Sequence, residues 1–128
     1  MITSKNIHLL ISSLIVIPTG ILYGFKSDLQ FELYPKTIDE FNFYKAIMGL
    51  YLGFSMLWIY GILKPQILKT AIITNIVFML GLGLGRTISM FSDGIPTFGY
   101  KFGVLAELFL GFYGIWILSK IDNTKKQE

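Results

Sequence analysis

The chain has 128 residues, of which 53% are apolar and only 15% are charged, and its mean hydropathy is +0.61. Soluble domains usually have about a quarter of their residues charged, so this composition argues against a soluble globular protein. The length predicts one domain, and the lack of cysteine excludes disulfides and cysteine metal sites. Most of the net charge of +3 lies between the apolar runs or in the C-terminal tail, so it does not predict nucleic-acid binding.

The first apolar run, residues 7–25, contains no Asp, Glu, Lys or Arg. At about 1.5 Å per residue it is long enough to cross a hydrocarbon core of about 30 Å. A signal peptide is the alternative, but its apolar core is about 7–15 residues long and is followed by small residues at a cleavage site. Tyr23, Phe25 and Lys26 occur there instead. We therefore expect a retained helix, which Pro18 kinks.

Three further apolar runs predict three more helices, so the expected fold is an all-α bundle of four transmembrane helices forming one domain. The expected spans are 7–25, 43–63, 67–91 and 97–118, followed by a polar tail over 119–128. The break at Lys64 and Pro65 is very short, which makes the second and third helices antiparallel neighbours. The connection 26–42 mixes charges with aromatic residues, and two interpretations stay open: a short interfacial helix or cap, and a solvated loop.

The distribution of lysine and arginine predicts the orientation. With the N-terminus inside, the inner segments hold Lys5, Lys64, Lys69, Lys120, Lys125 and Lys126. The outer loop 26–42 holds only Lys26 and Lys36, while Lys45, Arg86 and Lys101 lie at or within outer helix ends. The positive-inside rule therefore favours both termini in the cytoplasm.

Each span contains a Gly-x-x-x-Gly pair, and such pairs let helix backbones approach closely in lipid. The pairs are Gly20/Gly24, Gly49/Gly53, Gly81/Gly85 and Gly99/Gly103. Because a glycine-rich apolar sequence produces some pairs by chance, we expect two of the four to be helix contacts.

Two charged residues lie well inside the expected spans. Glu107 lies about ten residues into the fourth span, about 15 Å deep, and Arg86 lies about 7 Å from the outer end of the third. An ionised carboxylate at mid-membrane costs at least about 2.5–3.5 kcal/mol, so Glu107 is expected to be paired, protonated or hydrated. An arginine side chain spans the difference in depth, and we therefore expect an Arg86–Glu107 ion pair.

Helical phase predicts that polar faces of three spans converge on this pair. At 100° per residue, Asn75, Arg86 and Asp93 share a sector of the third span, with Ser89 offset by about 60°. The candidate ligand-binding residues are Lys45, Asn75, Arg86, Ser89, Asp93 and Glu107. The functional interpretation is a polar pocket, open to the outer side, for a lipid head group, a small anion or a proton-linked ligand. The structural interpretation is an ion pair that fixes helix register.

The remaining polar residues form no catalytic or metal-binding pattern. The sequence contains no Walker motif, nucleophile elbow, zinc motif or Rossmann fingerprint. No catalytic residue, metal ligand or cofactor is therefore predicted. His8 is predicted to be an interfacial residue, and Tyr51 and Tyr100 are assigned with the other large aromatics to interfacial belts or bundle packing.

Two segments, KAIMGLYLGFSMLW and GLGRTISMFSDGIP, together with a glutamate in the last span, resemble the bacterial DUF4345 family. The resemblance covers about residues 7–118, and its pattern falls on Gly85, Arg86, Ser89, Asp93, Gly94, Pro96 and Glu107. Family members often carry arginine where this chain has Lys45, which keeps the charge but removes the planar fork. The resemblance implies a four-span protein of the bacterial cytoplasmic (inner) membrane, and it implies no activity.

The preferred hypothesis is a small membrane protein that binds a lipophilic or anionic ligand. Arg86 and Lys45 would hold its negative group, Glu107 would orient Arg86, and Asn75 would form a deeper polar wall. One alternative is a structural or accessory subunit that docks onto a membrane protein or a second copy. Another is an enzyme acting on a lipid or a quinone, for which the sequence offers no nucleophile–base pair. The expected partners are the lipid bilayer and these ligands or proteins, not nucleic acid.

Overall fold

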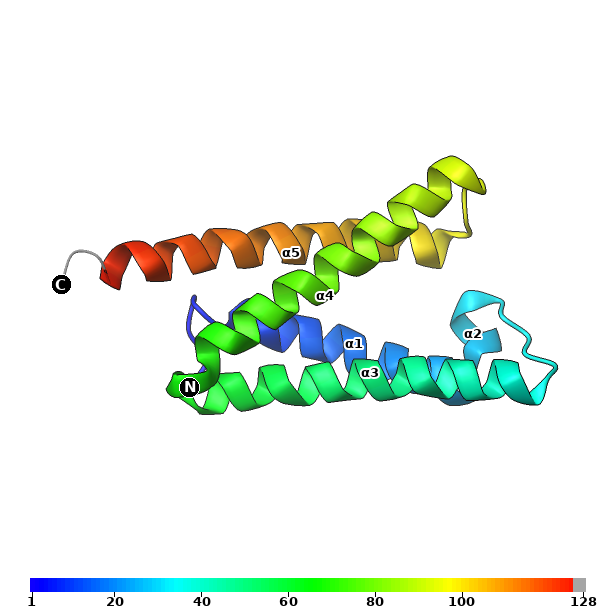
Figure 1. Cartoon of the computed structure of the whole chain (residues 1–128), viewed down its shortest axis with the longest axis horizontal. Helices are drawn as coiled ribbons and strands as arrows, with labels where there is room; N and C mark the ends of the chain where they lie inside the picture. The colour runs from blue at the N-terminus through cyan, green and yellow to red at the C-terminus, as the bar shows by residue number, and fades with distance from the viewer. Residues whose placement is uncertain (126–128) are drawn as a thin grey trace.

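The chain is an all-α protein in the computed structural model, which describes residues 1–125 (Figure 1). Its helices are α1 (Ile7–Phe25), α2 (Ser27–Phe31), α3 (Ile38–Leu63), α4 (Pro65–Ser92) and α5 (Phe98–Lys125). All except α2 are long and apolar enough to span a membrane. This confirms the predicted all-α bundle with four transmembrane helices.

Two helices begin earlier than their hydrophobicity predicts. The second long helix, α3, starts at Ile38 instead of residue 43, because Thr37 and Glu40 form a capping box. The Thr37 hydroxyl accepts from the Glu40 amide at 3.2 Å, and the Glu40 carboxylate accepts from the Thr37 amide at 2.9 Å. The third, α4, begins with Pro65 at its first turn, where proline's missing N–H costs nothing. Helix ends are thus set by capping chemistry and not by where the apolar run begins.

The last helix continues beyond the expected span. Residues 119–125, expected as part of a polar tail, belong to α5, and the other residues of that tail, 126–128, lie outside the described part. An exposed ion pair of 2.7 Å joins Asp122 to Lys69 near the start of α4. The helix therefore extends past its apolar stretch and contacts the neighbouring helix through charges.

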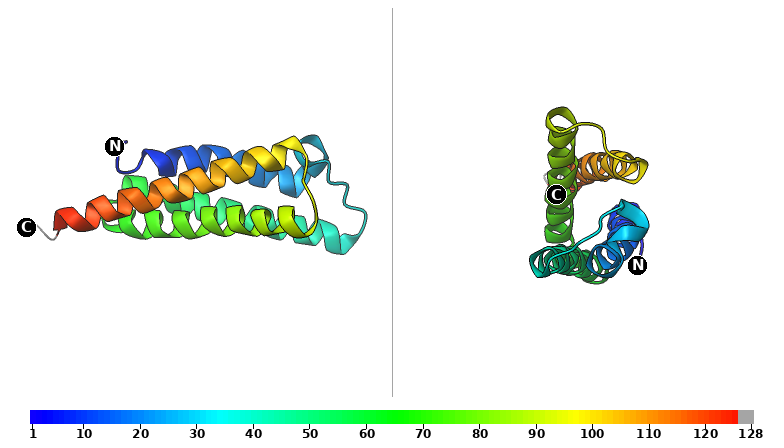
Figure 2. Two further views of the ribbon diagram at one scale, coloured as in Figure 1. Left: turned by 90° about the horizontal axis from the view of Figure 1, so that it is seen from above. Right: turned by 90° about the vertical axis from the view of Figure 1, so that its right-hand side faces the viewer.

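The four long helices form two hairpins. Contacts are densest between α1 and α3 and between α4 and α5, and α4 also packs on α3, while α1 and α5 contact each other little. Viewed end-on, the helices form an open C with its gap between α1 and α5, and α4 crosses the molecule obliquely (Figures 1 and 2). The interior is therefore bordered by α4 on one side and least covered on the other.

The Gly-x-x-x-Gly pairs differ in whether their glycines face a neighbouring helix. A Cβ on Gly20 would lie 2.7 Å from the Tyr51 Cβ, and Gly24 lies against Met48, so this pair joins α1 to α3. A Cβ on either glycine of the pairs in α3 and α4, Gly49/Gly53 and Gly81/Gly85, would meet no described atom within 4 Å. The α1 pair therefore contacts α3 through both of its glycines.

The connection between α1 and α3 folds back over one end of the bundle. It contains α2, then Glu32 in the left-handed conformation with φ 53°, and then a stretch without helix. The Ser27 hydroxyl donates to the Leu33 carbonyl at 3.0 Å, and Leu33 packs against the core. Of the two interpretations for this segment, the short helix capping the bundle describes it better than a solvated loop.

Candidate functional site

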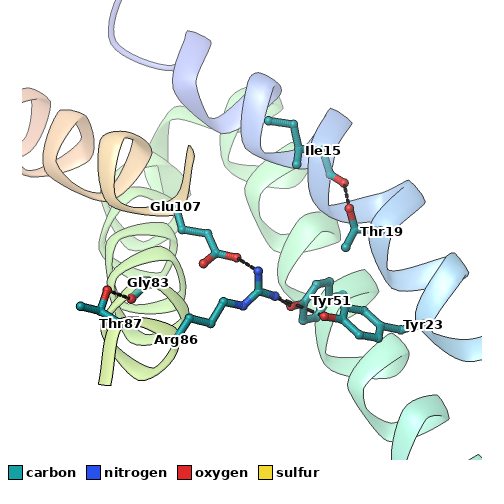
Figure 3. Close-up of polar contacts among 8 residues, drawn as sticks. All are labelled: Ile15, Thr19, Tyr23, Tyr51, Gly83, Arg86, Thr87 and Glu107. Atoms are coloured by element: carbon teal, nitrogen blue, oxygen red, sulfur yellow. Dashed lines mark hydrogen bonds and ion pairs between the residues drawn. The ribbon is translucent and has the colours of Figure 1, made fainter. Parts of the chain in front are cut away.

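The expected Arg86–Glu107 ion pair is present inside the bundle (Figure 3). Arg86 Nη1 lies 3.1 Å from Glu107 Oε1, and the two side chains are only 19% and 11% exposed. Arg86 comes from the last third of α4 and Glu107 from the first half of α5. These helices are antiparallel neighbours, so the pair closes across the α4/α5 hairpin.

Three tyrosines complete the environment of the guanidinium. Arg86 Nη2 donates to the Tyr23 hydroxyl at 3.3 Å and to the Tyr51 hydroxyl at 3.5 Å (Figure 3). The ring of Tyr100 lies 5.4 Å from the guanidinium carbon, within cation–π range. We call Arg86, Glu107 and the three tyrosines the Arg86 cluster. Tyr23 comes from α1, Tyr51 from α3, Arg86 from α4, and Tyr100 and Glu107 from α5. The Arg86–Glu107 pair, which joins α4 to α5, is thus also in contact with α1 and α3.

A glycine makes room for the guanidinium. A Cβ on Gly103 would lie 2.6 Å from Arg86 Nη1 and 3.9 Å from Glu107 Oε1. One turn of α5 separates Gly103 from Glu107, so both face the same side of the helix. Gly103 therefore belongs to the site through the space that it leaves, although it contributes no polar atom.

The cluster is accessible from three directions. Arg86 borders a pocket of about 110 Å³ between α1 and α5, which Thr19, Phe102 and Glu107 also line. It borders a second of about 310 Å³ beside Ser89 and Tyr100, and an apolar one of about 450 Å³ beside Leu50, Phe54 and Val77. Arg86 is the residue that lines all three of these pockets.

One acceptor of the pair remains available. Glu107 Oε2 is buried and has no hydrogen-bond partner among the described residues. A buried carboxylate oxygen without a donor costs free energy, so a donor supplied by a bound molecule would stabilise the site. The pair can thus offer donors from Arg86 and an acceptor from Glu107 to the same molecule.

The structure does not bring Lys45 to this site, which corrects the expected convergence. Lys45 is exposed, and its Nζ lies 5.4 Å from the Phe25 ring centroid and 5.5 Å from that of Phe41. Gly49, on the same face of α3, is open as well, while Tyr51 points inward and is 5% exposed. Helical phase identified which residues share a face but not which face points inward.

The other predicted residues divide between two places. Ser89 lines a pocket with Arg86, and its hydroxyl donates to Asp93 at 2.8 Å at the exposed end of α4. Asn75 is fully buried, eleven residues before Arg86 and therefore about 16 Å farther along the helix. Ser89 thus borders the site, Asp93 supports Ser89 from outside it, and Asn75 lies too deep to share it.

Asn75 belongs instead to a set of buried polar side chains in the other half of the bundle. The set comprises His8, Ser12, Ser55, Trp58 and Asn75, each at most 1% exposed. All five have side-chain nitrogen or oxygen atoms without a hydrogen-bond partner among the described residues. His8, expected at the interface, packs inside against Tyr113 with ring centroids 5.5 Å apart. His8 is buried and not interfacial because this part of α1 packs against the other helices.

The three tyrosines around Arg86 are residues of the candidate site that the sequence analysis did not identify. Two signals point to them. A guanidinium has five N–H donors, more than one carboxylate accepts, so a buried Arg86 requires further acceptors. Buried tyrosine hydroxyls in turn need partners. The sequence leaves undetermined which of the seven tyrosines point inward.

A family model described as "Domain of unknown function (DUF4345)" matches residues 4–118 of the chain. No curated protein and no solved structure matches the chain. The matched region includes every residue of the Arg86 cluster.

Proposed function

The chain belongs to the DUF4345 family, and from the Arg86 cluster we propose that this multi-pass membrane protein binds a lipophilic ligand through a polar or anionic head group. Arg86 donates hydrogen bonds to the head group, Glu107 orients Arg86, and the apolar pockets around them take the ligand's apolar part. Ser89 borders the same space. Lys45, Asn75 and Asp93 lie outside this proposed site.

The observation that carries the proposal is the position of Arg86 at the junction of three pockets. An arginine kept only to fix helix register gains nothing from facing open space on several sides. In a membrane protein the molecules that reach such pockets are lipids and other membrane-soluble compounds. Intramembrane ionisable residues are expensive, and a functional role is the usual reason that they persist.

The charge of the site limits what it binds. Arg86 and Glu107 together are neutral, so the site does not attract a free anion by net charge. It offers donors on the guanidinium and an acceptor on Glu107 Oε2 within one small space. A head group with an acceptor and a hydroxyl or amide donor fits this arrangement better than a bare inorganic anion.

Native mass spectrometry of the protein, purified in mild detergent, tests the proposal. We expect wild type to retain a defined small molecule that Arg86→Gln and Glu107→Gln both lose. Lys69→Gln is the matched control, because it breaks the exposed ion pair with Asp122 instead. An equal ligand content in wild type and all three variants would contradict the proposal.

A second candidate function has its own supporting observation. The cluster takes one residue from each of α1 and α3 and ties them to the α4/α5 hairpin, as a register-fixing device would. In that case the protein serves as an accessory subunit, and the open glycine faces of α3 and α4 are where a partner helix would dock. A partner protein that co-purifies with wild type and is lost on Gly81→Leu would favour this function.

We also propose that both termini face the cytoplasm in a bacterial inner membrane. The two ends of the described chain lie at the same end of the bundle (Figure 1). Lys64 and Lys69 lie at that end as well, in the short turn between α3 and α4 and at the start of α4. The positive-inside rule assigns such an end to the cytoplasm.

A further inference from the structure

A pocket of about 250 Å³ lies at the end of the bundle that α2 covers. Its aromatic lining comes from Tyr23, Phe25, Tyr34, Phe41 and Tyr44, and Asp28 supplies a carboxylate. We call it the aromatic pocket. It is lined by residues from the end of α1, from α2, from the stretch that follows α2 and from the first turns of α3. Figure 1 shows this part of the chain folding back over one end of the bundle.

The electrostatics of the aromatic pocket favour a cation. Aromatic faces carry partial negative charge and attract ammonium groups. The pocket is also lined by the last residues of α1, where the helix dipole places partial negative charge. Asp28, which also lines the pocket, adds a negative charge. At the start of α3 the opposite dipole end is offset by Asp39 and Glu40 in the first turn.

The chain itself shows that these rings accept an ammonium. Lys45 Nζ lies 5.4 Å from the Phe25 ring centroid and 5.5 Å from the Phe41 ring centroid, within the range of cation–π attraction. Lys45 already uses these two rings and its positive charge opposes that of Asp28, so a bound cation would rely on the rings of Tyr23, Tyr34 and Tyr44. Arg86, the only arginine in the sequence, is paired with Glu107 and donates a hydrogen bond to the Tyr23 hydroxyl oxygen.

We propose that the aromatic pocket binds a quaternary ammonium group, either on a lipid head group or on a free small cation. A quaternary ammonium needs no hydrogen-bond acceptors, which suits a lining of several rings with one carboxylate. The volume is slightly below the roughly 300–1,000 Å³ of pockets for drug-sized ligands, so it suits a head group and not a whole lipid. The proposal does not rest on ligand binding at the Arg86 cluster, although the two sites share Tyr23.

Choline and its neutral analogue 3,3-dimethyl-1-butanol separate charge from shape. We would titrate each into the protein in an uncharged maltoside detergent and follow the methyl resonances by NMR. Choline is expected to bind at least fivefold more tightly than the alcohol, since only choline gains cation–π attraction. In a second arm, native mass spectrometry compares retained phosphatidylcholine with retained phosphatidylglycerol, which identifies a lipid source.

Two variants connect binding to the pocket. Tyr34→Leu removes a ring and Asp28→Asn removes the charge, and each is expected to weaken choline or phosphatidylcholine binding roughly threefold to tenfold. Tyr34 is 67% exposed, so its replacement leaves the fold intact. Tyr34→Phe keeps the ring and should retain binding, and Tyr60→Leu, at the far end of α3, is the matched control.

The outcomes decide the proposal. The proposal is supported if the protein prefers choline to the alcohol, or phosphatidylcholine to phosphatidylglycerol. This preference must be lost in Tyr34→Leu and kept in Tyr34→Phe and Tyr60→Leu. The arm that shows the preference identifies the source of the cation. Equal binding of choline and the alcohol, together with equal retention of the two lipids, would overturn it. So would binding that none of the variants changes. Neither altered residue belongs to the Arg86 cluster, so this proposal and the proposed function fail separately.

Discussion

Arg86 and Glu107 satisfy each other's charge in a place where neither charge would be stable alone. Their side chains are 19% and 11% exposed, so removing one partner leaves the other charge with little solvent. Breaking a buried pair from one side typically costs about 3–5 kcal/mol, whereas replacing both partners by apolar residues is often neutral. This asymmetry gives a prediction about stability that does not depend on any ligand.

We expect Arg86→Met and Glu107→Leu, made singly, each to lower the free energy of unfolding by about 3–5 kcal/mol. The double variant should be closer to wild type than either single variant, because no buried charge remains. Thermal denaturation in detergent, analysed as a double-mutant cycle, measures this. If the two single effects simply added in the double variant, the pair would not be energetically coupled.

The expected effect of replacing a helical glycine depends on what the glycine faces. Gly103 on α5 faces the guanidinium, and a Cβ there would lie 2.6 Å from Arg86 Nη1. Gly81 on α4 faces open space, with no described atom within 4 Å of an added Cβ. The same substitution at these two positions therefore has opposite expected effects.

We expect Gly103→Ala to displace Arg86 and to reduce both stability and ligand retention. Gly81→Ala should stabilise α4 by about 0.5–1 kcal/mol, because alanine has the better helix propensity and nothing is displaced. Melting temperatures of the two variants in one detergent provide the comparison. A Gly103→Ala protein as stable and as well loaded as Gly81→Ala would show that the guanidinium does not need that space.

The four spans could be predicted from the sequence because apolar length alone determines them. The Arg86–Glu107 pair was predictable for a similar reason, since depth along two antiparallel helices follows from residue counting. The inward face of α3 could not be predicted. Lipid and core are both apolar, so this helix carries no polar face to mark the outside, and the choice between Lys45 and Tyr51 depends on packing.

The start of a helix could be predicted from a local sequence pattern, whereas the burial of a single side chain could not. The pattern Thr37-x-x-Glu40 is visible in the sequence and specifies the start of α3 better than hydrophobicity does. The burial of His8 has no such local signal. It depends on how α1 packs against Tyr113 of α5, which is a property of the whole molecule.

At the scale of the whole molecule, we propose that the Arg86 cluster holds a ligand in addition to joining the four long helices. The double variant Arg86→Met/Glu107→Leu separates these roles, because it is expected to fold while lacking both charges. Native mass spectrometry of this variant beside wild type is the most direct test. We expect a ligand on wild type and a folded, ligand-free mass for the double variant. The same ligand bound equally to both proteins would contradict it.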